Sequence, residues 1–110
     1  MTPLRILFVE DNPLDTELAV RELEKNGYEL EWQRVDTEAE FTSRLAHNPP
    51  DLVISDHAMP QFSSSEALRC LHNSGLTIPF IVVSQAIGDE EAVKLMRAGA
   101  ADYLLKDRMA

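Results

Sequence analysis

The sequence predicts one domain with an α/β fold, in which helices cover both faces of a doubly wound five-stranded parallel sheet. Short apolar runs alternate with segments of helical length along all 110 residues, which is the pattern of βαβ units. The central runs are almost continuously apolar, as in strands covered on both faces. A hydrophobic fraction of 45% and a charged fraction of 26% are ordinary for a globular chain, and this length suits a single core over residues 1–110.

The strands are expected where β-branched or Leu-rich runs occur. The second run places Leu30, Trp32 and Arg34 at alternate positions, which suits an edge strand with one face toward water. The others are more uniformly apolar and suit the middle of the sheet. The five expected strands are Leu4–Val9, Glu29–Val35, Leu52–Ile54, Ile78–Val83 and Asp102–Leu105.

The first two helices are marked at their ends by capping and breaking residues. Helix 1 is expected to begin at Asn12 and Pro13, a polar cap followed by a proline, and to end near Gly27. The second helix follows Asp36 or Thr37, pairs two apolar residues four positions apart, and stops before a pair of prolines. Both segments therefore have the length and the signals of crossover helices.

Two further helices complete the alternation. One is expected over Ser64–Asn73, with Ser63 or Ser64 as its N-cap, and the other from near Asp89 to just before Gly99. The alternation also predicts a helix after the fifth strand. Only five residues follow Leu105, so we expect that last helix to be truncated or absent.

The charge balance narrows the possible partners. Nineteen acidic and ten basic residues give a net charge of -9, which disfavours direct binding to nucleic acid or to an anionic membrane surface. Carboxylates can still recruit hard divalent cations. Cys70 is the only cysteine, so no internal disulfide can form, and the first eleven residues suit neither a signal peptide nor a membrane span. The expected compartment is the cytoplasm.

Polar residues follow four of the expected strands: Glu10 and Asp11, then Asp56, Ser84 and Lys106. Because the carboxyl ends of parallel strands meet at one edge of a sheet, these side chains are expected to converge there. Carboxylates that lie this close together repel one another unless a divalent cation or Lys106 compensates. With an octahedral Mg²⁺ in place, an aspartate can act as a nucleophile toward a phosphoryl donor.

Four of these residues also have a simpler interpretation. Asp11 could cap the first helix, Asp56 and Ser84 could be turn residues, and Lys106 could be a solvated charge. Their occurrence in order at the ends of four of the five expected strands is what favours the functional interpretation. His57 directly follows Asp56, but adjacent strand residues point to opposite faces, so we expect no catalytic role for it.

Four segments carry a resemblance to a known family: ILFVEDNPLD, DLVISDHAMP, IPFIVVSQA and GAADYLLKD. With these segments the chain resembles a response regulator receiver domain of two-component signalling over essentially its whole length. The resemblance implies a flavodoxin-like fold with the strand order 2-1-3-4-5. That order puts the reversal, where ligands bind, between the first and third strands.

The resemblance also implies a role for each site residue. Glu10 and Asp11 would form the acidic pocket that binds Mg²⁺ or Mn²⁺ together with Asp56, which would be the phosphorylated residue. The backbone carbonyl of Ala58 would be a further metal ligand. The roles implied for the remaining residues are a hydrogen bond from Ser84 to the phosphoryl group, an ion pair from Lys106, and an aromatic switch at Tyr103.

In function, the resemblance implies a phosphorelay receiver rather than a turnover enzyme. It would take a phosphoryl group from a phosphohistidine on a sensor histidine kinase or a histidine phosphotransfer domain, and lose it slowly by hydrolysis. The surface of the fourth helix and fifth strand would then change toward a partner. An output domain in the same parent chain is expected, and a homodimer is possible.

Three alternatives remain, together with two departures from the family pattern. A pseudo-receiver would keep the fold as an interaction module without phosphorylation. A flavodoxin-like cofactor binder would need a phosphate-cradling loop where EDNPLD stands, and a haloacid-type phosphatase would need an acid at Ala58.

Asp107 follows Lys106 where the family usually has proline, so we expect a trans bond or local strain there. The loop QFSSS lacks the usual acidic and glycine residues, so its conformation is not predicted.

Overall fold

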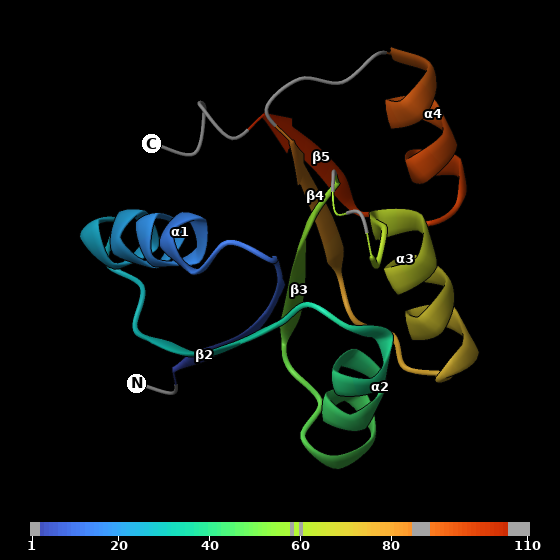
Figure 1. The fold of residues 1–110 in the computed structure, drawn as a ribbon. Helices are drawn as coiled ribbons and strands as arrows, with labels where there is room; N and C mark the ends of the chain where they lie inside the picture. The colour runs from blue at the N-terminus through green and yellow to red at the C-terminus, as the bar shows by residue number, and fades with distance from the viewer. Residues whose placement is uncertain (1–2, 58, 60, 85–88, 106–110) are drawn as a thin grey trace.

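The structure is a computed structural model that describes residues 3–57, 59, 61–84 and 89–105. Its five strands form one parallel sheet in the order β2-β1-β3-β4-β5 (Figure 1). The strand order that the family resemblance implied is therefore confirmed, and β2 is an edge strand as its alternation predicted. The strands are β1 (Leu4–Val9), β2 (Leu30–Val35), β3 (Leu52–Asp56), β4 (Phe80–Ser84) and β5 (Asp102–Leu105).

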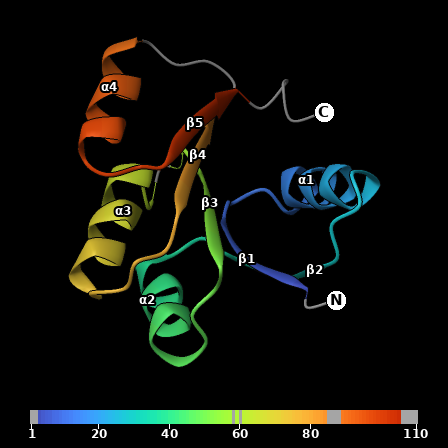
Figure 2. The ribbon, with the colours of Figure 1, turned by 180° about the vertical axis from the view of Figure 1, so that it is seen from behind.

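Helices cover the two faces of the sheet unequally. Helix α1 lies alone on one face, while α2, α3 and α4 lie on the other (Figures 1 and 2). Within the described ranges no helix follows β5, and residues 106–110 lie outside them. None of the helices in these ranges has the length and apolar character needed to cross a bilayer. The helices are α1 (Pro13–Lys25), α2 (Glu38–His47), α3 (Ser64–Asn73) and α4 (Asp89–Arg97).

The boundaries agree with the sequence signals to within about two residues. Strand β4 begins at Phe80 rather than at Ile78, next to a proline that has no N–H to donate to a neighbouring strand. Asn12 caps α1 by accepting a hydrogen bond from the backbone two residues on. Ser63 caps α3 in a capping box with Glu66. The QFSSS loop is therefore ordered at its junction with α3.

The core has two parts that follow the alternation of the strands. The larger part lies between the sheet and α2, α3 and α4, and includes the tilted ring pair Phe41 and Phe62, whose centroids are 5.6 Å apart. The smaller part lies on the α1 face and contains Ile54 of β3. Because side chains alternate along a strand, Asp56 shares the face of Ile54, and His57 faces the opposite side.

Candidate functional site

Three carboxylates meet at the carboxyl edge of the sheet, where the strand order reverses between β1 and β3. Glu10 and Asp11 follow β1, and Asp56 ends β3; one oxygen of each lies within 4.8 Å of the others. Glu10 is 5% exposed and Asp56 is 7% exposed, whereas Asp11 is exposed to solvent. The structure thus brings together the three acids that were predicted to hold a metal ion.

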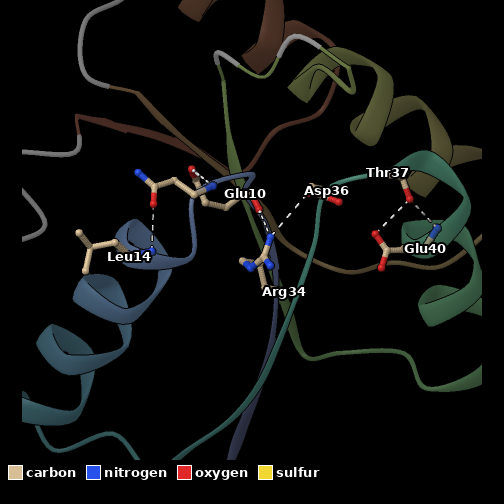
Figure 3. Close-up of polar contacts among 7 residues, drawn as sticks. Glu10, Leu14, Arg34, Asp36, Thr37 and Glu40 are labelled. Carbon is tan, nitrogen blue, oxygen red and sulfur yellow. Dashed lines mark hydrogen bonds and ion pairs between the residues drawn. The ribbon is translucent and has the colours of Figure 1, made fainter.

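The turn that carries two of these acids is held by its backbone and by β2. The Glu10 amide donates to the carbonyl oxygen of Val35 at 3.0 Å, and the Asn12 amide donates to Oε1 of Glu10 at 3.1 Å. Arg34 donates from Nη1 to the carbonyl oxygen of Glu10 at 3.1 Å and forms an ion pair of 3.6 Å with Asp36 (Figure 3). These contacts fix the Glu10 carboxylate at the edge of the sheet.

Arg34 was not predicted as part of this site. Its place in an alternating edge strand was visible in the sequence, but only the pairing of Phe8 with Arg34 between β1 and β2 brings it to the end of β1. A residue 24 positions from Glu10 gives no local signal of such a contact. The contact follows from the register of β1 and β2.

The donor set suits a hard divalent cation. Carboxylate oxygens are the ligands that Mg²⁺ and Mn²⁺ prefer, and three of them within 4.8 Å carry negative charges that a cation would offset. Two of the three acids are buried, where water screens their mutual repulsion less than at the surface. The residues present therefore fit a metal ion at this edge.

A cavity of about 210 Å³ opens beside the acids, between α1 and the sheet. Its walls include the apolar side chains of Phe8, Ile54 and Val83, and both Glu10 and Asp56 belong to its lining. Asp56 is therefore largely covered by protein and still borders a space that could admit a small group. The cavity lies on the face that carries α1 alone.

The other predicted residues divide between described and undescribed positions. Ser84 ends β4 and is buried, and its neighbour Val83 pairs with Asp56 across the β3–β4 ladder. Tyr103 pairs with Val82, its hydroxyl is buried, and its ring packs against the larger core. Ala58 and Lys106 lie outside the described residues, as does the Lys106–Asp107 bond, so those roles and that bond stay predictions.

His57 faces away from the acids, as the alternation predicted. Its Nδ1 shares a hydrogen bond of 2.9 Å with the hydroxyl of Ser64, the first residue of α3. Its ring lies edge-on to that of Tyr103, with centroids 6.4 Å apart. Sequence reasoning gave no sign of these two contacts, because they depend on how the β3–α3 loop and β5 are placed over the same face.

The sequence of the chain matches a known protein family. The family model described as the response regulator receiver domain matches residues 6–109. The chain is 36% identical over 104 residues to the response regulator MprA of Mycobacterium sp. (strain KMS), which covers 94% of this chain and 44% of that protein. The chain thus spans less than half the length of this relative.

Solved structures share the fold. A response regulator from Hahella chejuensis superposes with a TM-score of 0.84 at 26% identity, covering 97% of this chain and 83% of that one. The Mn²⁺-bound form of response regulator Rcp1 superposes with a TM-score of 0.80 at 21% identity, covering 94% and 81%. At this low identity, the likeness to Rcp1 shows a shared fold and nothing further.

Proposed function

Because this chain belongs to the response regulator receiver domain family, we propose that it accepts a phosphoryl group on Asp56 from a phosphohistidine. The phosphohistidine would belong to a sensor histidine kinase or a histidine phosphotransfer domain. The observation that carries the proposal is the meeting of the Glu10, Asp11 and Asp56 carboxylates within 4.8 Å at the carboxyl edge of β1 and β3. In receiver domains such an acidic pocket holds Mg²⁺ or Mn²⁺, and the donor set here fits either ion.

The transfer forms one bond and breaks one. A carboxylate oxygen of Asp56 attacks the phosphorus of the phosphohistidine, a P–O bond forms, the P–N bond breaks, and its electron pair leaves with the imidazole. When bound, the divalent cation supplies charge neutralisation for the incoming phosphoryl oxygens. Water later attacks the same phosphorus and releases inorganic phosphate, which regenerates the Asp56 carboxylate. The domain is thus a signalling acceptor rather than a turnover enzyme.

The remaining residues bind and orient the phosphoryl group. Glu10 and Asp11 would hold the cation beside Asp56, assisted by the carbonyl oxygen of Ala58. The hydroxyl of Ser84 donates to one phosphoryl oxygen, and the ammonium of Lys106 pairs with another. The burial of Ser84 and its place beside the β3–β4 ladder support its part in this scheme.

Phosphorylation would change the surface offered to a partner. As Ser84 is drawn toward the phosphoryl group, the packing around Tyr103 changes, and with it the surface of α4 and β5. Since the chain spans 44% of the MprA relative, we propose that an output domain outside this segment, or a second copy of the chain, reads that surface. The runner-up is a pseudo-receiver that works without phosphorylation, and the complete acidic cluster disfavours it.

A small phosphodonor tests the proposal. Incubation with acetyl phosphate and Mg²⁺ should add the mass of one phosphoryl group, and the adduct should be labile at alkaline pH, as an acyl phosphate is. Asp56→Asn should remove the adduct, whereas Asp51→Asn, at the opposite end of β3, should keep it. A normal yield from Asp56→Asn would refute the assignment, and the absence of any adduct in the parent protein would favour the pseudo-receiver.

A further inference from the structure

The residue after Asp56 is fixed by the sheet and faces away from the acids. The backbone N–H of His57 donates to the carbonyl oxygen of Val83 at 2.9 Å, which carries the β3–β4 hydrogen bonding one residue beyond the end of β3. Any movement of the Asp56 backbone is therefore passed directly to His57. Its side chain projects over the face covered by α3 and α4.

One edge of the imidazole is tied to the start of α3. Nδ1 of His57 and Oγ of Ser64 share a hydrogen bond of 2.9 Å, and Ser64 is completely buried. A buried hydroxyl that loses its partner costs more than an exposed one does. The bond therefore couples the position of the ring to the first turn of α3.

The same ring also contacts β5. The His57 and Tyr103 rings lie 6.4 Å apart between centroids at an interplanar angle of 61°, in an edge-on arrangement. The Tyr103 hydroxyl is buried, and the phenol ring packs against the larger core. Edge-to-face contacts between rings depend on orientation, so this contact favours the buried orientation of the phenol over one that points to solvent.

We propose that His57 is a positioning residue that holds the Tyr103 ring in its buried orientation and links the phosphoacceptor end of β3 to α3. Asp56 and His57 are consecutive, so phosphorylation of Asp56 would shift His57. Both α3 and β5 would then respond, because the His57 ring contacts Ser64 and Tyr103. That last step rests on the proposed function. The hold on Tyr103 and on α3 exists in the unphosphorylated protein and can be tested there.

Two substitutions separate the two contacts of the ring. His57→Asn keeps a polar atom near the position of Nδ1 for the bond to Ser64 and removes the ring that faces Tyr103. The complementary substitution, His57→Phe, keeps a ring beside Tyr103 and removes the hydrogen bond to Ser64. A general loss of stability would affect both contacts in both variants, so opposite effects of the pair identify positioning.

Fluorine NMR of 3-fluorotyrosine reports on the ring. In a Tyr28→Phe background the only fluorinated residue is Tyr103, since the chain has two tyrosines and Tyr28 is exposed. We expect the ratio of buried to exposed ring to fall about two- to tenfold in His57→Asn and to stay near the parent value in His57→Phe. An unchanged spectrum in His57→Asn, or an equal change in both variants, would overturn the hold on Tyr103.

Hydrogen exchange of backbone amides reports on the start of α3. The first turn of α3 should exchange faster in His57→Phe and in Ser64→Ala than in the parent, and His57→Asn should resemble the parent. Parent-like exchange in both His57→Phe and Ser64→Ala would overturn the link to α3. The same samples should take phosphate from acetyl phosphate in parent-like yield, and failure of the parent to do so would refute the proposed function while leaving these two readouts decisive.

Discussion

The guanidinium of Arg34 donates a hydrogen bond of 3.1 Å to the carbonyl oxygen of Glu10. A residue of the edge strand β2 thereby supports the turn that carries two of the three acids. The charge of Arg34 is balanced by Asp36 at 3.6 Å, and both side chains are partly exposed. Its effect on the acids is therefore mainly one of position rather than of long-range charge.

Removing this support should weaken metal binding. We expect Arg34→Ala to lower the affinity for Mg²⁺ by about tenfold, because loss of an outer contact that orients a ligand typically has an effect of this size. Calorimetric titration of Mg²⁺ measures it. Arg34→Lys should restore part of the affinity, and Arg5→Ala, at the other end of the β1–β2 pair, should leave it unchanged. Tighter Mg²⁺ binding by Arg34→Ala would mean that charge repulsion outweighs positioning.

Neutralising one acid should change stability in opposite directions with and without metal. In EDTA, Asp56→Asn removes one of three carboxylates that lie within 4.8 Å, so the melting temperature should rise, by roughly 4–8 °C for each 1 kcal/mol gained. With Mg²⁺ at a hundred times its dissociation constant, the parent should gain about 2.7 kcal/mol, and Asp56→Asn should gain much less.

Thermal denaturation of both proteins in both conditions measures this reversal. Glu17→Gln removes an exposed charge from α1 and serves as the control, which should respond to Mg²⁺ as the parent does. If Asp56→Asn were less stable than the parent in EDTA, repulsion among the acids would not dominate the metal-free state.

The first turn of α2 should make stability depend on acid pH. The Thr37 hydroxyl donates to Oε1 of Glu40 at 3.1 Å (Figure 3), and this hydrogen bond, with smaller help from the Asp36 backbone, lowers the pKa of Glu40 from its ordinary value of 4.5. The folded state therefore favours the charged form. The stabilisation that the charged Glu40 carboxylate provides is complete above its unfolded-state pKa and is lost as the pH falls through the lower folded-state pKa.

Substitution at either partner should flatten this dependence. Between about pH 6 and pH 3, the melting temperature should fall less for Glu40→Gln and for Thr37→Ala than for the parent. Glu17→Gln, which alters an exposed acid of α1, should follow the parent curve. Identical slopes for Glu40→Gln and the parent would show that the Thr37 hydrogen bond does not persist in solution.

Much of the fold could be predicted from local patterns, and the residues that could not are instructive. The apolar runs predicted the strands, and the capping residue Asn12 marked the start of α1, because both signals depend on neighbours in sequence. Phe62 was not predicted to be buried, since it stands in the polar loop QFSSS. It is 1% exposed and packs against Phe41, a contact that depends on where α2 lies.

The candidate site divides in the same way. Glu10, Asp11 and Asp56 could be identified because each stands at the carboxyl end of a strand, and parallel strands bring these ends to one edge. Arg34 and Ser64 could not, because their contacts depend on the register of β2 and on the path of the β3–α3 loop. The position of a residue at a strand end is enough to predict that its side chain lies at the edge of the sheet. Contacts between strands or with loops can be identified only from the structure.

Gly99 adopts φ +110°, and a Cβ placed on it would lie 2.8 Å from Nε2 of His72. Gly27 has a similar φ of +93°, with no atom within 4 Å of a Cβ. The two glycines therefore share the backbone penalty of a side chain at positive φ, about 1–2 kcal/mol, and differ in the contact. His72 is exposed, and its ring is the end of a flexible side chain, so it can turn away at a modest cost.

We therefore expect Gly99→Ala and Gly27→Ala each to destabilise the protein by about 1–2 kcal/mol. For Gly99→Ala we expect an excess of no more than about 1 kcal/mol for moving the His72 ring. Urea denaturation of the two variants measures the excess. Adding His72→Ala to each should remove it, because the alanine leaves room for the new Cβ. An excess of several kcal/mol that His72→Ala abolishes would show that the ring is held firmly between α3 and α4.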